Sequence, residues 1–264
     1  MWQVGSHVSR RQSAVGALVL VLLVVAASCR AQSRPTTHAS SDSLRVPILV
    51  YHSIAPHHPG QTAEQRLLDV DTAVFREQMS YLVAHKFNVI SLEKLVDALD
   101  GRATIPEQAV VITFDDGWED QYTHAVPILR QLGMTATFFV YSTAIGVDGA
   151  SMTWEQVREL QAGGMTIGCH SRTHPMLTTA GANLHDEVET SREDIQRSLG
   201  TRPDLFAYPY GAWDARVADA VRAAGYRAAR AFPGGAWNTA KDLFALHAVL
   251  VTDDMTAFER EVGP

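Results

Sequence analysis

The sequence predicts a single-domain α/β fold in which strands and helices alternate. Short runs rich in β-branched and aromatic residues recur between segments whose apolar residues follow helical spacing. This alternation is typical of parallel strands with covering helices, arranged as either an open sheet or a (β/α) barrel. Several predicted strands end in polar residues, and in a barrel the C-terminal strand ends share one rim. We find neither an internal repeat nor a second domain in the 264 residues.

The predicted strands are short, apolar and bounded by turn-forming or polar residues. They cover residues 46–52, 88–91, 110–114, 136–141, 165–170, 205–208, 226–231 and 246–251. Helices are predicted where apolar residues recur at helical spacing, with Ser91 and Thr153 as N-caps and Gly163 as a stop. They cover residues 71–85, 92–99, 122–132, 154–162, 182–199 and 215–224.

The first 45 residues have the features of an exported protein. Arg10 and Arg11 precede an apolar run at 14–27, which is too short to span a bilayer comfortably. We expect a signal at 1–29, a flexible tether at 30–45, and a folded domain at 46–264 in the periplasm or outside the cell. Ala26-Ala27-Ser28-Cys29 resembles a lipoprotein cleavage box. Cys29 is therefore a candidate for lipidation and membrane attachment, with cleavage nearby or retention as an anchor as the alternatives.

Charge and cysteine content narrow the class of protein. The net charge of −7 and the absence of a dense Lys/Arg run argue against nucleic acid or an anionic membrane surface as the main partner. A neutral small molecule or polymer fits better. Cys29 and Cys169 are the two cysteines, which excludes a disulfide scaffold and predicts that Cys169 is a buried free thiol.

Residues 110–118 form an apolar strand that ends in two adjacent carboxylates and a glycine. Adjacent side chains on an extended backbone diverge, so Asp115 and Asp116 would take different roles, one binding a metal and the other handling protons. The competing interpretation is an ordinary Asp-Gly turn after a core strand.

A second polar segment follows the strand predicted at 165–170. His170 and His174 are four residues apart, and this spacing lets both imidazoles approach one ion at about 2.1 Å, as zinc requires. Two histidines and one carboxylate would leave open positions for water, as in a catalytic metal site. Otherwise His170 is a structural hydrogen-bonding residue and His174 a surface residue.

Together with a third segment, these motifs resemble those of the polysaccharide deacetylases, the NodB-homology or carbohydrate esterase 4 family. The matching segments are Thr113-Phe114-Asp115-Asp116-Gly117, His170-Ser171-Arg172-Thr173-His174 and Phe206-Ala207-Tyr208-Pro209-Tyr210-Gly211. Residues 46–52, 75–79 and 89–92 are similar to the branch of exported poly-N-acetylglucosamine deacetylases. The resemblance extends over residues 46–262.

The resemblance implies a distorted, incomplete (β/α) barrel, TIM-like with about seven strands, and a divalent metal, usually Zn²⁺. It implies that Asp116, His170 and His174 bind the metal and that Asp115 is the catalytic base. The implied activity is removal of N-acetyl groups from a β-linked N-acetylglucosamine polymer of the cell envelope by a metal-activated water. A backbone N–H near Tyr210 would help to stabilise the oxyanion.

The chain departs from the family's pattern in three places. The third motif usually carries an arginine that orients the catalytic aspartate, and this chain has Ala207 there, so either another group orients Asp115 or its basicity is tuned differently. The tryptophan-centred fourth motif has no match. The family's general acid is a histidine, for which His247 is the candidate, although residues 246–251 fit an ordinary last strand as well. If His247 is not the acid, a water or His52 would protonate the leaving amine.

Residues at or beyond the strand ends are expected to contact the acetylated polysaccharide. Aromatic faces there could stack on pyranose rings, with core packing as the alternative for each. The expected substrate-binding residues are Tyr208, Pro209, Tyr210, Trp118 and His52.

Two other functions stay open. One is an O-acetyl esterase acting on xylan or another acetylated glycan. The other is a catalytically idle glycan-binding module of the same fold, which the missing arginine at position 207 favours. The intact Asp115-Asp116 pair and the two motif histidines argue against the idle module.

Overall fold

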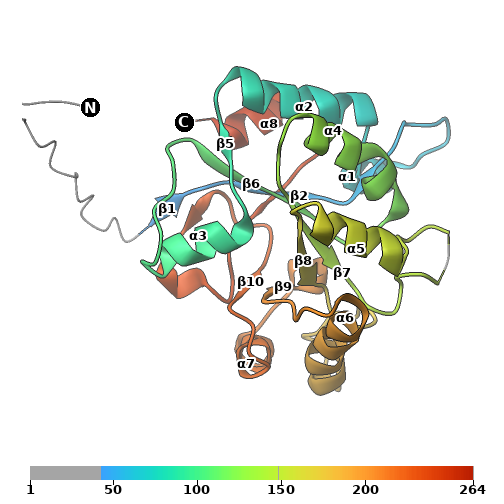
Figure 1. The fold of residues 1–264 in the computed structure, drawn as a ribbon, viewed down its shortest axis with the longest axis vertical. Coiled ribbons are helices and arrows are strands. Elements are labelled where there is room, and N and C mark those ends of the chain that lie inside the picture. The colour runs from blue at the N-terminus through green and yellow to red at the C-terminus, as the bar shows by residue number, and fades with distance from the viewer. Residues whose placement is uncertain (1–42, 148, 264) are drawn as a thin grey trace, which may run out of the picture. The chain divides into compact units, whose positions relative to one another are not determined.

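The computed structural model describes residues 43–147 and 149–263 (Figure 1). The strands are β1 (Leu44–Arg45), β2 (Ile48–Tyr51), β3 (Ser53–Ile54), β4 (Asp69–Val70), β5 (Asn88–Val89), β6 (Ala109–Phe114), β7 (Thr137–Val140), β8 (Thr166–Cys169), β9 (Leu205–Ala207), β10 (Ala228–Arg230), β11 (Trp237–Asn238) and β12 (Val249–Leu250). The α-helices are α1 (Ala63–Leu68), α2 (Thr72–Ala84), α3 (Leu92–Leu99), α4 (Val126–Gln131), α5 (Trp154–Ala162), α6 (Ser191–Leu199), α7 (Ala215–Ala223) and α8 (Met255–Val262). π-Helical turns at Gln121–Ala125 and His185–Thr190 lead into α4 and α6, and 3₁₀ turns lie at Pro209–Gly211 and Ala240–Asp242.

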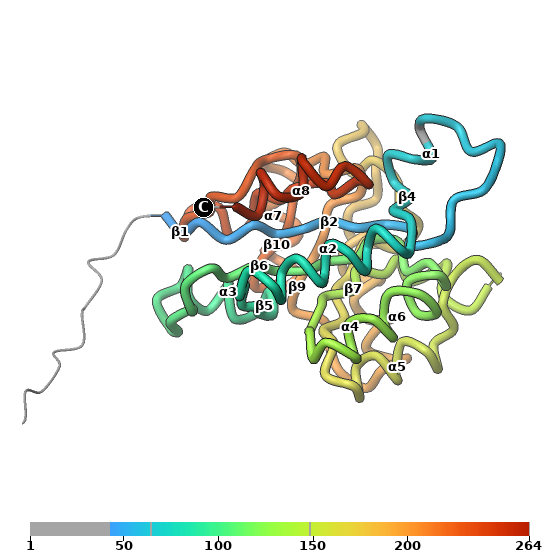
Figure 2. The backbone as a smooth tube through the Cα atoms, turned by 90° about the horizontal axis from the view of Figure 1, so that it is seen from above, coloured from blue at the N-terminus to red at the C-terminus, as the bar shows by residue number. Residues whose placement is uncertain are grey.

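The main sheet is parallel and has the strand order β10-β9-β8-β7-β6-β2-β12, with β5 also paired to β6. Arg230 of β10 makes an isolated parallel bridge to Leu246, just ahead of β12, so the two edges of the sheet approach each other. In Figure 2, α7 and α8 lie on one side of β2, and α4, α5 and α6 lie on the other. This arrangement is the predicted distorted, incomplete (β/α) barrel.

Alternation along each strand separates an inner from an outer face. On β6, Val111 packs in a cluster inside the barrel, whereas Ile112 packs in the cluster between the sheet and the outer helices. On β9, Phe206 belongs to the outer cluster and Ala207 to the inner one. The face on which a residue lies at a strand end therefore decides whether it can reach the barrel rim.

Side chains fill the barrel interior. Phe139 of β7 belongs to the inner cluster, and a Cβ atom at Gly168 of β8 would lie 2.4 Å from its ring. Gly168 pairs with Phe139 across the two strands, and the aromatic ring occupies the space that a side chain at position 168 would need.

The predicted strands and helices are present, and the caps at Ser91 and Thr153 are confirmed. Apart from β6, the strands are shorter than predicted, and the helices predicted at 122–132 and 182–199 begin with π-helical turns. The tether prediction needs one correction, because β1 lies inside it and pairs with β11. Arg45 fixes this start of the fold by donating to the carbonyls of Glu261 and Val262 at the end of α8. The short helices α1 and α8 were not predicted.

Cys169 is a buried free thiol, as predicted, and its Sγ lies 3.1 Å from Ser191 Oγ. The predicted signal at 1–29, with Cys29, lies outside the described residues. Within residues 43–147 and 149–263, none of the helices is long and apolar enough to span a membrane.

Candidate active site

Alternation directs polar side chains at the C-terminal strand ends into the barrel. His52 follows β2, Asp115 follows β6 and His170 follows β8, and all three are buried. Asp116 is next in sequence and has a φ of +74°, and Gly117 follows with +75°. The turn that this pair forms brings the carboxylate of Asp116 back to the same rim. The sequence therefore forms an Asp-Gly turn and also contributes both carboxylates to the polar cluster.

Three potential ligand atoms converge at this rim. Asp116 Oδ1 lies 3.6 Å from His170 Nε2 and 3.3 Å from His174 Nε2, and the two imidazole nitrogens are 3.3 Å apart. Ligand atoms at about 2.1 Å around a tetrahedral zinc ion are about 3.4 Å from one another. Spacing and chemistry both fit a divalent metal. Within the described part of the chain, no other three His, Cys, Asp or Glu residues come close enough to share an ion.

The protonation of the histidines also suits metal binding. His170 Nδ1 lies 2.7 Å from the carbonyl oxygen of Ala207, which can only accept, so Nδ1 carries the proton and Nε2 presents its lone pair. Burial lowers the pKa of His170 to about 3 and also lowers the pKa of His174. Both rings are therefore neutral near pH 7, the form that binds metals.

Trp118 was expected to bind substrate, and the structure gives it a contact within the site. Its indole Nε1 donates to Asp116 Oδ2 at 3.1 Å, so Oδ1 is the oxygen that faces the imidazoles. Burial raises the pKa of Asp116 to about 6, and the nearby negative charge of Asp115 adds to this rise. A cation among the three ligand atoms would favour the ionised carboxylate.

Asp115 is paired with an arginine that the sequence patterns did not identify. Arg230 Nη2 lies 2.5 Å from both carboxylate oxygens, and both side chains are fully buried. Burial by itself would raise the pKa of Asp115, but the positive charge of Arg230, helped by His170 and His52, outweighs it and lowers that pKa. Asp115 is therefore ionised at neutral pH, as a catalytic base must be.

Arg230 resolves the departure at position 207. Arg230 on β10 pairs in register with Ala207 on the neighbouring strand β9. The guanidinium therefore starts from the same height in the sheet as position 207, where the family usually has its arginine, but from the next strand. One feature of the sequence pointed to a buried partner for Arg230. It lies between alanines in a predicted strand, and charged residues are rarely buried without a partner.

His52 lies on the rim beside the same carboxylate. Its Nε2 is 3.9 Å from Asp115 Oδ2, and its ring meets that of Phe232 edge-on. The buried amide of Gln121 donates to the backbone carbonyls of His52 and Asp115, which ties the ends of β2 and β6 together. Gln121 was not predicted as a site residue, because its position in a helical turn gives no sign of this role.

Two of the expected substrate-binding residues do not reach the rim. Tyr208 directly follows β9 and packs in the outer cluster, between the sheet and the helices. It is fully buried, and its hydroxyl donates to the carbonyl of Phe244. Pro209 is buried as well. Tyr210 is 57% exposed, has a φ of +59°, and its ring centroid lies 4.8 Å from that of His174. Of the third motif, Tyr210 is the side chain best able to meet a substrate.

His247 is not brought to the cluster. Its Nδ1 lies 3.0 Å from the carbonyl oxygen of Trp237, and its N–H donates to Asn238 in β11. The register of β12 explains this position, because Val249 pairs with Leu49 and His247 thus precedes the strand. His52 and His170 are the histidines whose Nε2 atoms lie 3.9 Å from Asp115, and of these His52 is not one of the three metal-ligand candidates.

Comparison with known proteins agrees with this geometry. Residues 102–229 match the polysaccharide deacetylase family, a range that includes both aspartates and both histidines of the cluster. YxkH of Bacillus subtilis (strain 168), named as a polysaccharide deacetylase, is 27% identical over 213 residues, which are 80% of this chain and 73% of its own. The chain belongs to the polysaccharide deacetylase family.

As a polysaccharide deacetylase, it is a hydrolase that removes acetyl groups from polysaccharides. It is 23% identical over 259 residues to the poly-β-1,6-N-acetyl-D-glucosamine N-deacetylase of Escherichia coli (strain K12), covering 79% of this chain but 38% of that protein. Its fold is that of the Streptococcus pyogenes deacetylase PplD in complex with acetate, with a TM-score of 0.77, 24% identity, and coverage of 84% of this chain and 99% of the other. The family match ends one residue before Arg230.

Proposed function

We propose that this deacetylase is a metal-dependent N-deacetylase, with Zn²⁺ as its metal, acting on a β-linked N-acetylglucosamine polymer of the cell envelope. The observation that carries the proposal is the convergence of Asp116, His170 and His174 on one point beside an ionised, buried Asp115. The choice of polymer is supported by the similarity to the Escherichia coli enzyme, which is named for its action on poly-β-1,6-N-acetyl-D-glucosamine.

Asp116, His170 and His174 would hold the metal. When bound there, a divalent metal would supply polarisation of an acetyl carbonyl and a lower pKa for a nearby water. Asp115 then takes a proton from the water that attacks the carbonyl carbon, because its carboxylate is ionised and its Oδ2 lies 3.9 Å from Nε2 of His170. Arg230 keeps Asp115 charged and fixes its orientation.

His52 and Tyr210 complete the proposed reaction. His52 protonates the leaving amine, since its Nε2 lies on the rim 3.9 Å from the same Asp115 oxygen. The backbone N–H of Tyr210 donates to the oxyanion, and its exposed ring offers a face to a pyranose.

The proposal includes export to the periplasm or the cell exterior, with lipid attachment through Cys29 as an option. It is supported by the basic and apolar pattern of residues 1–29. An envelope polymer is a substrate that such an enzyme would meet.

The experiment that tests this function compares the purified protein with Asp115→Asn on an N-acetylglucosamine oligomer, with and without a chelator. We expect about one zinc per chain, acetate and new amine in equal amounts, and loss of both on chelation. Asp115→Asn should bind metal normally and lose turnover, whereas Asp219→Asn on the exposed face of α7 should match the wild type.

Two results would redirect the assignment. Release of acetate from acetylated xylan without new amine would indicate an O-acetyl esterase. Folded protein that binds no zinc would overturn the metal site and leave a glycan-binding module.

A further inference from the structure

The loop between the two metal-ligand candidates has an unfavourable backbone conformation. Ser171 has a φ of +69° and His174 one of +62°, and neither is a glycine. Residues with a Cβ atom rarely adopt such a conformation unless their surroundings hold them there. Within the loop, the N–H of His174 donates to Ser171 Oγ at 3.0 Å, but this contact does not hold Arg172 and Thr173, the residues between.

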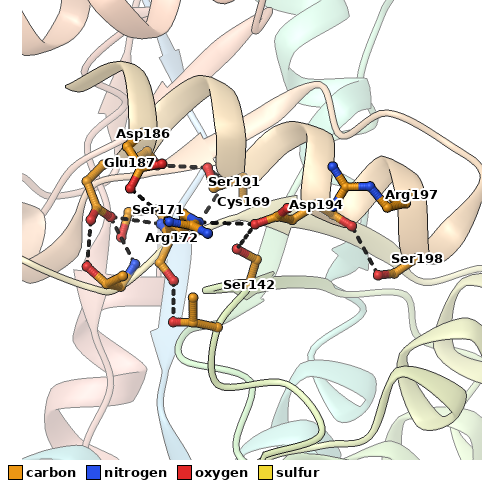
Figure 3. A network of polar contacts seen from close by, with 12 residues as sticks. Ser142, Cys169, Ser171, Arg172, Asp186, Glu187, Ser191, Asp194, Arg197 and Ser198 are labelled. Carbon is orange, nitrogen blue, oxygen red and sulfur yellow. Dashed lines mark hydrogen bonds and ion pairs between the residues drawn. The ribbon is translucent and has the colours of Figure 1, made fainter. Parts of the chain in front are cut away.

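A buried carboxylate on a neighbouring helical turn holds this loop (Figure 3). Glu187 Oε2 accepts hydrogen bonds from the backbone N–H groups of Arg172 and Thr173, both at 2.9 Å. Its Oε1 accepts from Thr173 Oγ1 at 2.5 Å. Two consecutive N–H groups directed at one anion fix the path of the backbone between the two histidines.

Glu187 is itself fixed. Its side chain is 7% exposed, and its backbone carbonyl accepts from Ser191 Oγ at 2.7 Å. Ser191 in turn contacts Cys169, the residue before His170 (Figure 3). The turn that carries Glu187 is therefore anchored to the strand that carries the first ligand.

Other contacts hold the same loop from two sides. The guanidinium of Arg172 pairs with Asp186 at 2.9 Å and with Asp194 at 3.3 Å, both in the helical segment of Glu187. On the other side, Thr143 donates its N–H and its Oγ1 to the carbonyl of Arg172. Of these partners, Glu187 is the one whose contacts reach Thr173, the residue next to His174.

We propose that Glu187 is a positioning residue that pre-forms the metal site by holding the 171–174 loop in its strained conformation. The proposal rests on the metal site of the proposed function. Glu187 makes no hydrogen bond to Asp116, His170 or His174 among the contacts of the described residues, so it acts through the backbone of Arg172 and Thr173. In its absence the loop relaxes, and binding a metal has to drive the loop back into place.

The test measures the affinity of the metal-stripped protein for Co²⁺ together with the visible absorption of bound Co²⁺, which reports its coordination. Glu187→Ala removes all three contacts and should weaken Co²⁺ binding by about 10–100-fold. Glu187→Gln keeps the shape and loses the charge, and Thr173→Val removes one contact at an exposed position. Both should give smaller losses, in proportion to the contacts they remove.

The matched control is Glu189→Ala. Glu189 lies on the same turn and has the same charge, but its exposed carboxylate contacts the exposed His185. Its Co²⁺ affinity should stay within about twofold of the wild type. A second readout needs no metal, because backbone amide exchange at Arg172 and Thr173 should accelerate in Glu187→Ala and stay unchanged in Glu189→Ala.

The outcomes separate the inference from the proposed function. Wild-type Co²⁺ affinity in a folded Glu187→Ala protein would overturn the positioning role and leave the metal site intact. If Glu187→Ala does not fold, unchanged affinity in both Glu187→Gln and Thr173→Val overturns it equally. A wild type that binds no Co²⁺ would overturn the proposed function, and with it the positioning of a metal ligand.

Discussion

Arg230 and Asp115 are 115 residues apart in sequence, yet Nη2 of the arginine lies 2.5 Å from both oxygens of the aspartate. Both side chains are fully buried, and the guanidinium carbon lies 5.2 Å from the ring of Phe139 and 5.6 Å from that of Phe232. Removing one partner of a buried ion pair leaves an uncompensated charge, which costs more than the pair contributes when intact. The catalytic charge of Asp115 and the stability of the barrel therefore depend on one arginine.

Arg230→Met should lower both activity and stability. Without the guanidinium, burial raises the pKa of Asp115, so the acid limb of the kcat/KM profile should move to higher pH. Stability at pH 7 should fall by about 3–5 kcal/mol. In the wild type the pKa of Asp115 is lowered, so the stabilisation is full above about pH 4 and is lost as the pH falls through the folded pKa. Thermal melts and rate profiles between pH 4 and pH 8 measure both effects.

Arg227→Met is the matched control. Arg227 lies three residues earlier, is partly exposed and pairs with Asp97 near the surface. This variant should change stability by less than about 1 kcal/mol and leave the acid limb in place. An Arg230→Met enzyme whose acid limb stays at the wild-type pH would show that Arg230 does not set the charge of Asp115.

His52 and His247 should differ sharply as candidates for the general acid. His52→Gln should lower kcat on an N-acetylglucosamine oligomer by about 100-fold or more, because the amine leaves poorly without a proton. The same variant should lose much less on an aryl acetate, whose leaving group needs no proton. His247→Gln should retain near wild-type kcat on both substrates, since its ring contacts the carbonyl of Trp237. A large loss on the oligomer in His247→Gln, with near wild-type kcat in His52→Gln, would return the acid role to His247.

The sequence predicted the parts of the site whose residues lie close together in the chain. Asp115 and Asp116 are adjacent, and His170 and His174 share one short segment, so the motifs together with the strand assignments were sufficient to group them. Their convergence needed the additional knowledge that C-terminal strand ends share a rim. The alternation that puts Ala207 and Tyr208 on opposite faces of the sheet was also present in the sequence, but it shows which of them faces the barrel interior only once the inner face is known.

The contacts that were missed join distant segments. Arg230 becomes the partner of Asp115 only through the register of β10 with β9, and register is not encoded by any local pattern in a short strand of alanines. Glu187 lies on a π-helical turn inside a segment predicted as one regular helix. His247 was a candidate because a histidine follows a leucine there, but the β11 contact that holds it comes from a strand of two residues that was not predicted.

Asp116→Asn should stabilise the metal-free protein while abolishing its stabilisation by zinc. Burial raises the pKa of Asp116 to about 6, so the folded state favours the protonated form, and this stability is lost as the pH rises from about 4 to about 6. At pH 7 the ionised carboxylate therefore costs the metal-free protein about 1–3 kcal/mol, and a neutral amide avoids this cost. Melting temperatures at pH 7 with chelator and with zinc measure both effects.

In chelator, the Asn variant should melt at a higher temperature than the wild type, and in zinc at a lower one. Asp219→Asn, on the exposed side of α7, should follow the wild type in both conditions. An Asn variant that gains as much from zinc as the wild type would mean that Asp116 is not a ligand.

Metal affinity should fall in acid as the carboxylate of Asp116 gains a proton. The pKa of Asp116 is raised to about 6, whereas that of His170 is lowered to about 3 and that of His174 is also lowered, in each case mainly by burial. Between about pH 5 and pH 6 the carboxylate of Asp116 must therefore lose a proton before metal binds, whereas His170 is already neutral, so the association constant should fall by at least about tenfold per pH unit there and level off above pH 7. Co²⁺ titrations followed by visible absorption measure this slope. A slope steeper than about a hundredfold per pH unit would mean that both imidazoles titrate in this range as well, and that the lone pair of His170 Nε2 is not kept free by the Ala207 carbonyl.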